Sequence, residues 1–107
     1  MYYIYMLRCE DNSVYTGITT NLKRRMEEHF NQNDKCAKYT LNHSASKLEV
    51  AWETENRVLA SKLEYHIKKL TKKDKEKIIQ NVDEMNRLLE NKVECSKYKI
   101  WGSVKYE

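Results

Sequence analysis

Residues 2–18, YYIYMLRCEDNSVYTGI, decide the fold expected for this chain. Aromatic and branched residues that favour β structure alternate through Tyr2–Cys9, and the same pattern resumes over Ser13–Ile18. Between them stand the turn-forming polar residues Glu10, Asp11 and Asn12. The stretch therefore predicts a β-hairpin.

The length of the hairpin loop decides which tyrosines share a face, because side chains alternate with a period of two. A two-residue loop would put Tyr5 and Tyr15 on opposite faces. A three-residue loop with Asn12 in the left-handed conformation would instead pair Leu7 with Tyr15. One face then carries Tyr3, Tyr5, Tyr15 and Gly17. The other face is more apolar and is the better candidate for the core: Ile4, Met6, Val14, Thr16 and Ile18.

The sequence after the hairpin predicts a helix over about Leu22–Asn31. Thr19, Thr20 and Asn21 supply capping side chains, and the apolar residues recur at helical spacing. The pairs Lys23 with Glu27 and Arg24 with Glu28 are expected as ion pairs on its outer side. The following polar stretch, 31–46, is long for a loop in a compact domain, and such loops are often functional.

The rest of the chain predicts one more strand and two more helices. Lys47–Thr54 alternates as a strand, with Leu48, Val50 and Trp52 on one face, and Arg57–Leu70 has helical periodicity. Thr71 and Asp74 form a capping box for a third helix that should continue to about Asn91. Its apolar stripe is Ile78, Val82, Met85 and Leu89.

The order β-β-α-β-α-α predicts the α+β class, with a three-stranded, mostly antiparallel sheet flanked by helices. We expect the main domain to cover residues 1–91. The C-terminal extension, 92–107, should pack on the same domain, either as an added strand or as an irregular segment.

Composition excludes several classes of protein. The 107 residues suit one small domain, and 40% hydrophobic content argues against disorder. The first apolar run, Tyr2–Leu7, is too short for a signal peptide or a membrane span, which favours the cytoplasm. Cys9, Cys36 and Cys95 form an odd set without a C-x-x-C pair, so neither a disulfide framework nor a structural zinc site is expected.

The net charge of +4 is concentrated in one segment, 61–80, which holds seven lysines against three acidic residues. Such a run is usually a solvated helix surface, but it also suits contacts to a phosphate backbone. The lysines that we single out as candidate nucleic-acid contacts are Lys62, Lys68, Lys69, Lys72 and Lys73.

Chemistry-bearing residues gather near the start of the first helix. The tyrosine face of the hairpin carries its phenols beside Gly17, a residue that lets backbone approach a ligand, and Arg25 and His29 share one helical stripe. Tyr, Arg and His together suit a phosphodiester site. The ordinary interpretation is that the tyrosines are packing residues, Arg25 a surface cation and His29 a helix-closing residue.

The ordered pattern Tyr3-Ile4-Tyr5, Tyr15-Thr16-Gly17, Asn21, Arg25, His29 and Glu64 resembles the GIY-YIG nuclease family, specifically its small stand-alone bacterial branch. Tyr3 stands where the family name has Gly, and Thr16 where it has Ile. The resemblance covers about Tyr2 to Ile79 and implies a sheet flanked by helices.

Carried over residue by residue, the resemblance implies that Tyr5 and Tyr15 are active-site phenols, Arg25 grips the phosphate and His29 assists. Glu64 would be the single carboxylate that binds Mg²⁺ or Mn²⁺, and Lys38 matches a basic position of the small branch. A phenol is a weak base near neutral pH, and we expect Arg25 and the metal ion to favour the phenolate.

The sequence thus predicts a metal-dependent endonuclease that hydrolyses DNA phosphodiester bonds in repair or recombination-type processing. Single-stranded, branched or damaged DNA is expected as the substrate, because no sequence-reading module is appended. The first alternative is a non-catalytic nucleic-acid-binding module with the same fold. The second is a protein-interaction domain that binds a partner or forms a homodimer.

Overall fold

The computed structural model describes residues 1–31 and 43–101. A four-stranded antiparallel sheet has the order β2-β1-β3-β4. Its strands are β1 (Tyr2–Cys9), β2 (Val14–Thr19), β3 (Ala45–Thr54) and β4 (Lys99–Ile100). The helices are α1 (Leu22–Phe30), α3 (Arg57–Lys68), α4 (Lys72–Gln80) and α5 (Glu84–Leu89), with a short 3-10 turn, η1, at Cys95–Lys97. The α+β class is confirmed.

The hairpin has the predicted three-residue turn. Asn12 adopts a φ of 69°, its amide donates to the Cys9 carbonyl at 2.9 Å, and Leu7 pairs with Tyr15. This register puts Tyr5 opposite Gly17. The tyrosine face and the apolar face of the hairpin are therefore divided as the loop length predicts.

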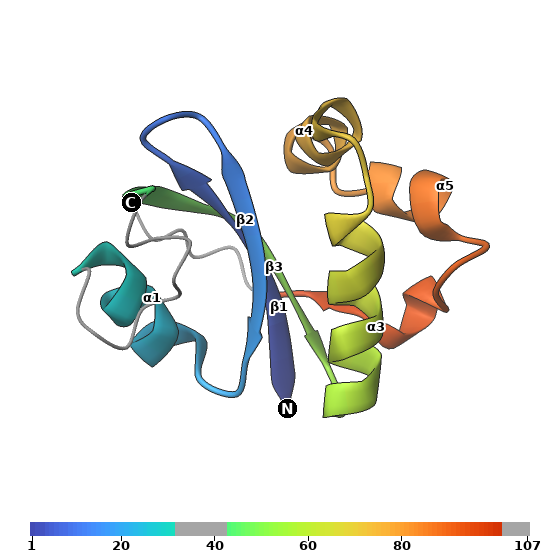
Figure 1. Cartoon of the computed structure of the whole chain (residues 1–107). Coiled ribbons are helices and arrows are strands. Elements are labelled where there is room, and N and C mark those ends of the chain that lie inside the picture. The colour runs from blue at the N-terminus through green and yellow to red at the C-terminus, as the bar shows by residue number, and fades with distance from the viewer. Residues whose placement is uncertain (32–42, 102–107) are drawn as a thin grey trace.

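Both faces of the sheet are covered, with α1 on one side and α3, α4 and α5 on the other (Figure 1). The tyrosine face is therefore core as well, whereas the sequence had favoured only the opposite face. On the α1 side Tyr5 packs with Leu22 and Met26, and on the α3 side Ile4 and Met6 pack in a separate cluster. The larger cluster also contains Trp52, Leu63, Ile67, Ile78, Met85 and Tyr98.

Three features of the sheet and helices differ from the sequence-based expectation. The sheet has a fourth strand, because β4 pairs with β3 at Trp52↔Ile100. The predicted third helix divides into α4 and α5 at Asn81, whose extended backbone ends α4 and whose side chain accepts from the amide of Asp83 at 3.1 Å. This side-chain hydrogen bond replaces the backbone hydrogen bonds of a continuous helix, although apolar residues continue at helical spacing beyond Asn81.

The third difference is the direction of Leu48. Leu7 pairs with Leu48 but Met6 pairs with Val50, so Glu49 is the extra residue of a β-bulge. The bulge turns Leu48 to the α1 side while Val50 stays on the α3 side.

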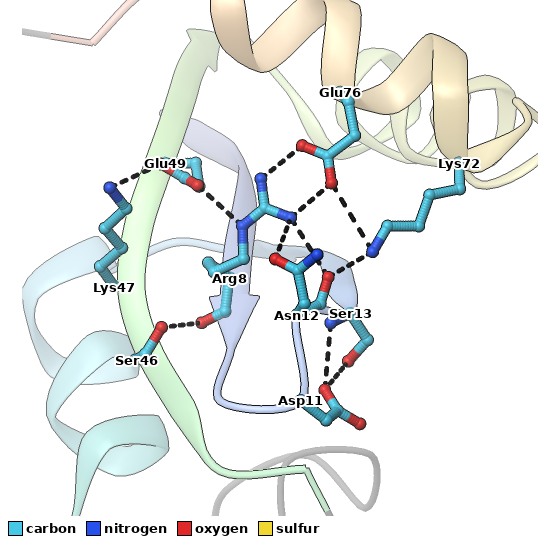
Figure 2. Close-up of polar contacts among 9 residues, drawn as sticks. All are labelled: Arg8, Asp11, Asn12, Ser13, Ser46, Lys47, Glu49, Lys72 and Glu76. Carbon is cyan, nitrogen blue, oxygen red and sulfur yellow. Dashed lines mark hydrogen bonds and ion pairs between the residues drawn. The ribbon is translucent and has the colours of Figure 1, made fainter.

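A partly buried ion-pair network, centred on Arg8, holds α4 against the hairpin tip (Figure 2). The Arg8 guanidinium donates to both carboxylate oxygens of Glu76 at 2.5 Å and to Glu49 at 2.9 Å. It also donates to Asn12, whose carbonyl accepts a further bond from Lys72. The bulge residue Glu49 thus supplies one of the two acidic partners of Arg8, and Glu76 supplies the partner from α4.

Candidate active site

Tyr5 lies at the centre of the candidate site, in β1 beneath α1. Only 1% of the residue is exposed. A Cβ atom added at Gly17 would lie 2.5 Å from the Tyr5 hydroxyl and 2.7 Å from its Cζ. Glycine is therefore needed at position 17 because the Tyr5 ring packs directly over it. The sequence had suggested a different reason, the approach of a ligand to the backbone.

The helix α1 brings Arg25 and His29 to this phenol. Asn21 caps the helix by accepting from the Arg24 amide at 3.0 Å, which fixes the helical phase next to the end of β2. The Tyr5 hydroxyl lies 2.9 Å from Nε2 of His29, and Nε of Arg25 donates to the same hydroxyl at 3.4 Å. The predicted i, i+4 stripe is thus directed at one oxygen atom.

Tyr15 completes a cluster of three rings with Tyr5 and His29. The ring centroids of Tyr5 and Tyr15 are 6.2 Å apart, and each lies 5.6 Å from that of His29. Tyr15 is partly exposed, in contrast to Tyr5 and to the fully buried His29. Of the two phenols, Tyr15 is therefore the one that has access to solvent.

Burial controls the protonation of the inner pair. Burial raises the pKa of Tyr5 well above its ordinary value of 10.0, and the nearby Tyr15 and Glu64 raise it further. The hydrogen bond from Arg25 lowers the pKa, as the sequence predicts, but in the protein alone its effect is smaller than that of burial.

Burial, followed by the charge of Arg25, lowers the pKa of His29 from 6.5 to about 4. Both partners of the 2.9 Å bond are therefore neutral at pH 7. Because the Tyr5 oxygen already accepts from Arg25, we assign the Tyr5 hydroxyl as the donor to Nε2 and place the imidazole proton on Nδ1.

Glu64 approaches this cluster from α3, which covers the opposite face of the sheet (Figure 1). The carboxylate is close enough for its charge to affect the pKa of Tyr5. Lys68, one turn further along α3, lies 3.3 Å from Glu64 Oε2 and 5.8 Å from the centroid of the Tyr15 ring. Glu64 and Lys68 therefore lie along the β2 edge, beside the phenols.

The remaining predicted lysines lie in different settings. Lys62, Lys69 and Lys73 are exposed, whereas Lys72 is hydrogen-bonded to the hairpin tip and lies 3.6 Å from Glu76. Lys38 lies outside the described residues. The basic segment is thus a surface of α3 and α4 that runs on from Glu64.

Glu28 is a site residue that the sequence interpretation assigned to the outer side of α1. Its Oε1 accepts from Nη1 of Arg25 at 2.8 Å, while Nε of the expected partner, Arg24, is 4.0 Å from Oε2. The i, i+3 spacing to Arg25 was the signal available in the sequence. Glu28 holds the Arg25 guanidinium beside the Tyr5 hydroxyl.

The family model of the GIY-YIG catalytic domain matches residues 1–78. The chain belongs to the GIY-YIG family. This GIY-YIG protein is 46% identical over 90 residues to UPF0213 protein FN1575 of Fusobacterium nucleatum. The aligned region covers 84% of this chain and 88% of the relative. The protein is 39% identical over 88 residues to UPF0213 protein YhbQ of Salmonella typhimurium, covering 82% and 86% respectively.

Among solved structures, this GIY-YIG chain resembles the solution NMR structure of UPF0213 protein BH0048 from Bacillus halodurans. The two are 32% identical, with a TM-score of 0.49, and the alignment covers 82% of this chain and 97% of the other. No helix in the described parts, 1–31 and 43–101, is long and apolar enough to cross a membrane.

GIY-YIG nucleases generally use divalent metal ions, and hard ions such as Mg²⁺ take oxygen ligands. Within the described residues, no group of three or more His, Cys, Asp and Glu side chains is placed to hold a metal. Glu64 supplies a hard carboxylate ligand near the phenols, while Glu28, which is also close, is bonded to Arg25. This donor set fits an ion such as Mg²⁺ or Mn²⁺ that keeps most of its water and takes substrate oxygens as ligands.

Proposed function

We propose that this protein is a metal-dependent endonuclease that hydrolyses DNA phosphodiester bonds. Its preferred substrates are single-stranded, branched or damaged DNA, as in repair or recombination-type processing in the cytoplasm. The observation that carries the proposal is the convergence of two phenols and Arg25 with Glu64, which comes from the opposite layer of the fold. Packing alone gives no reason for a carboxylate and a guanidinium to flank a phenol pair.

The two phenols have different roles in this mechanism. Tyr15 is partly exposed and lies beside the Lys68 ammonium, so it is the phenol that orients and deprotonates the attacking water. Tyr5 stays protonated because burial raises its pKa, and it holds His29 and Arg25 in place. His29 is therefore a positioning residue for Tyr5.

Arg25 binds the scissile phosphate. Glu28 and the Tyr5 oxygen fix two of its guanidinium nitrogens, Nη1 and Nε, and about 20% of the side chain is exposed. A planar guanidinium held in this way can donate to a phosphate oxygen as negative charge develops in the transition state. Gly17 is buried beneath the Tyr5 ring, so it acts here by making room for that phenol.

Glu64 would hold the divalent ion. When bound, the ion would polarise the scissile phosphate and stabilise the departing oxygen. The exposed lysines Lys62, Lys68, Lys69 and Lys73, together with Lys72 and Lys38, contact the DNA backbone. Contacts of this type position a strand and carry no sequence information.

A cleavage assay with Glu64→Gln tests the proposal. Purified wild-type protein with Mn²⁺ should nick labelled single-stranded or branched DNA, and the variant should lose at least about a hundredfold in rate, because the change removes the carboxylate that would hold the divalent ion. Glu90→Gln, which changes an exposed carboxylate at the C-cap of α5, is the matched control and should retain full activity. Wild-type protein that cuts no DNA, or a Glu64→Gln variant as active as wild type, would overturn the proposal.

The Glu64–Lys68 ion pair favours the second candidate function, a non-catalytic nucleic-acid-binding module. A lysine 3.3 Å from the carboxylate already supplies a cation where a metal ion would otherwise be needed. This alternative predicts salt-dependent DNA binding that the lysines of α3 and α4 carry, with no cleavage in Mg²⁺ or Mn²⁺.

A further inference from the structure

The outer face of α3 carries an aromatic side chain that the core does not use. Ala60, Leu63 and Ile67 are the buried residues of this helix. Tyr65 is 57% exposed and Val58 is 77% exposed. The helical spacing 58, 62, 65, 69 aligns both with Lys62 and Lys69 in one outward stripe.

The Tyr65 ring is surrounded by basic groups. Lys69 Nζ lies 5.4 Å from its centroid, and the His66 ring meets it edge-on with a centroid separation of 5.1 Å. Protein–protein interfaces are depleted in lysine, so an exposed tyrosine between lysines is a poor match for an apolar protein partner. It matches a nucleic acid, whose bases stack on aromatic rings while its phosphates pair with ammonium groups.

Tyr65 lies on the same turn of α3 as residues beside the candidate active site. It follows Glu64 in sequence, and Lys68, one turn away, contacts Glu64 and faces the Tyr15 ring. A strand whose phosphate lies between Arg25 and Glu64 would leave the site across this part of α3. The ring is thus positioned for a nucleotide that neighbours the one being cut.

We propose that Tyr65 is a stacking platform for an unpaired base next to the scissile phosphate. The location of that phosphate rests on the proposed function. A base inside a duplex has both faces covered by its neighbours, so it cannot stack on Tyr65 without leaving the helix. The platform therefore selects single-stranded, flapped or frayed DNA over an intact duplex.

The test compares full-length wild-type protein with Tyr65→Ala and Tyr65→Phe, in EDTA so that no DNA is cut. The probes are a fluorescein-labelled 20-nucleotide DNA strand and a blunt duplex of the same sequence, followed by anisotropy. Tyr65→Ala should weaken single-strand binding about tenfold or more and duplex binding by less than about twofold, because stacking on a side chain needs an unpaired base. Tyr65→Phe, which keeps the ring, should bind like wild type.

Two controls separate stacking from other effects. Val58→Ala removes exposed apolar area from the same stripe and should leave both affinities unchanged, and the thermal midpoint of Tyr65→Ala should equal that of wild type. In strands carrying 2-aminopurine, fluorescence quenching on binding should be present with wild type and lost with Tyr65→Ala.

Several results would overturn the inference. These are wild-type protein that does not bind the single strand, equal losses on single strand and duplex, no loss in Tyr65→Ala, or a Tyr65→Phe variant as weak as Tyr65→Ala. A concentration-dependent dimer that Tyr65→Ala abolishes while DNA binding is unchanged would assign the face to self-association. If wild type cuts no DNA in Mn²⁺ but the binding pattern holds, the nuclease proposal fails and the stacking platform stands.

Discussion

Replacing Gly17 with alanine should disturb the phenol cluster more than any surface change nearby. The new Cβ would lie 2.5 Å from the Tyr5 hydroxyl, and ordinary contact begins at 3.4 Å, so the phenol must move by about 0.9 Å. Tyr5 is buried, and the movement would break its 2.9 Å hydrogen bond to His29. Overpacking costs about 1–3 kcal/mol, and the unsatisfied buried nitrogen adds about 1–3 kcal/mol. We therefore expect a loss of about 3 kcal/mol in the free energy of unfolding.

Urea denaturation measures this loss, and a double-mutant cycle assigns it to the phenol. An alanine in a strand is ordinarily more stable than glycine by about 0.5–1 kcal/mol, so the expected sign is opposite to the intrinsic preference. In a Tyr5→Leu background, which lacks Cζ and the hydroxyl, Gly17→Ala should cost less than about 1 kcal/mol, giving a coupling energy of about 2 kcal/mol.

Cleavage of labelled single-stranded DNA in Mn²⁺ should fall in parallel, because the displaced Tyr5 no longer holds Arg25. A Gly17→Ala variant as stable as wild type, or one equally destabilised in both backgrounds, would refute the steric reasoning. Gly17 would then have another role, such as close approach of the DNA backbone.

Two further predictions concern stability. Folding lowers the pKa of His29 from 6.5 to about 4, so between these pH values the unfolded chain binds a proton that the folded chain does not. The free energy of unfolding is therefore at its full value above pH 6.5 and falls by about 3 kcal/mol as the pH drops from 6.5 to 4. His29→Leu should flatten this part of the stability–pH curve, and an unchanged curve would mean that another group is responsible. Arg8→Met should lower the free energy of unfolding by about 2 kcal/mol, since it removes the guanidinium that pairs with both Glu49 and Glu76. Arg24→Met, at a site 61% exposed, should cost less than about 0.5 kcal/mol, and equal costs would show that the network around Arg8 adds nothing.

The hairpin and the phenol face were predictable because their causes are local. The turn residues fix the loop length, the loop length fixes the register, and the register puts Tyr5 opposite Gly17. Arg25 and His29 follow from one helical stripe. For these residues, the separation along the sequence is enough to predict which side chains share a face.

The features that the sequence did not predict depend on competition between local and distant contacts. The predicted third helix is interrupted at Asn81 because the Asn81 side chain accepts a local hydrogen bond, although the apolar residues continue at helical spacing. The bulge that turns Leu48 depends on pairing with β1, and Glu49 at that bulge bonds to Arg8. The raised pKa of Tyr5 depends on how deeply α1 buries it, which no spacing reveals.

The position of Glu64 has a consequence for the order in which the protein becomes active. A growing chain emerges from the ribosome with the phenols, Arg25 and all of β3 before α3 begins at Arg57. The proposed metal ligand arrives only when α3 docks on the far side of the sheet (Figure 1). Under the proposed function, a nascent or partly unfolded chain would carry the phosphate-binding half of the site without the metal-binding half, so that DNA cleavage would be confined to fully folded molecules.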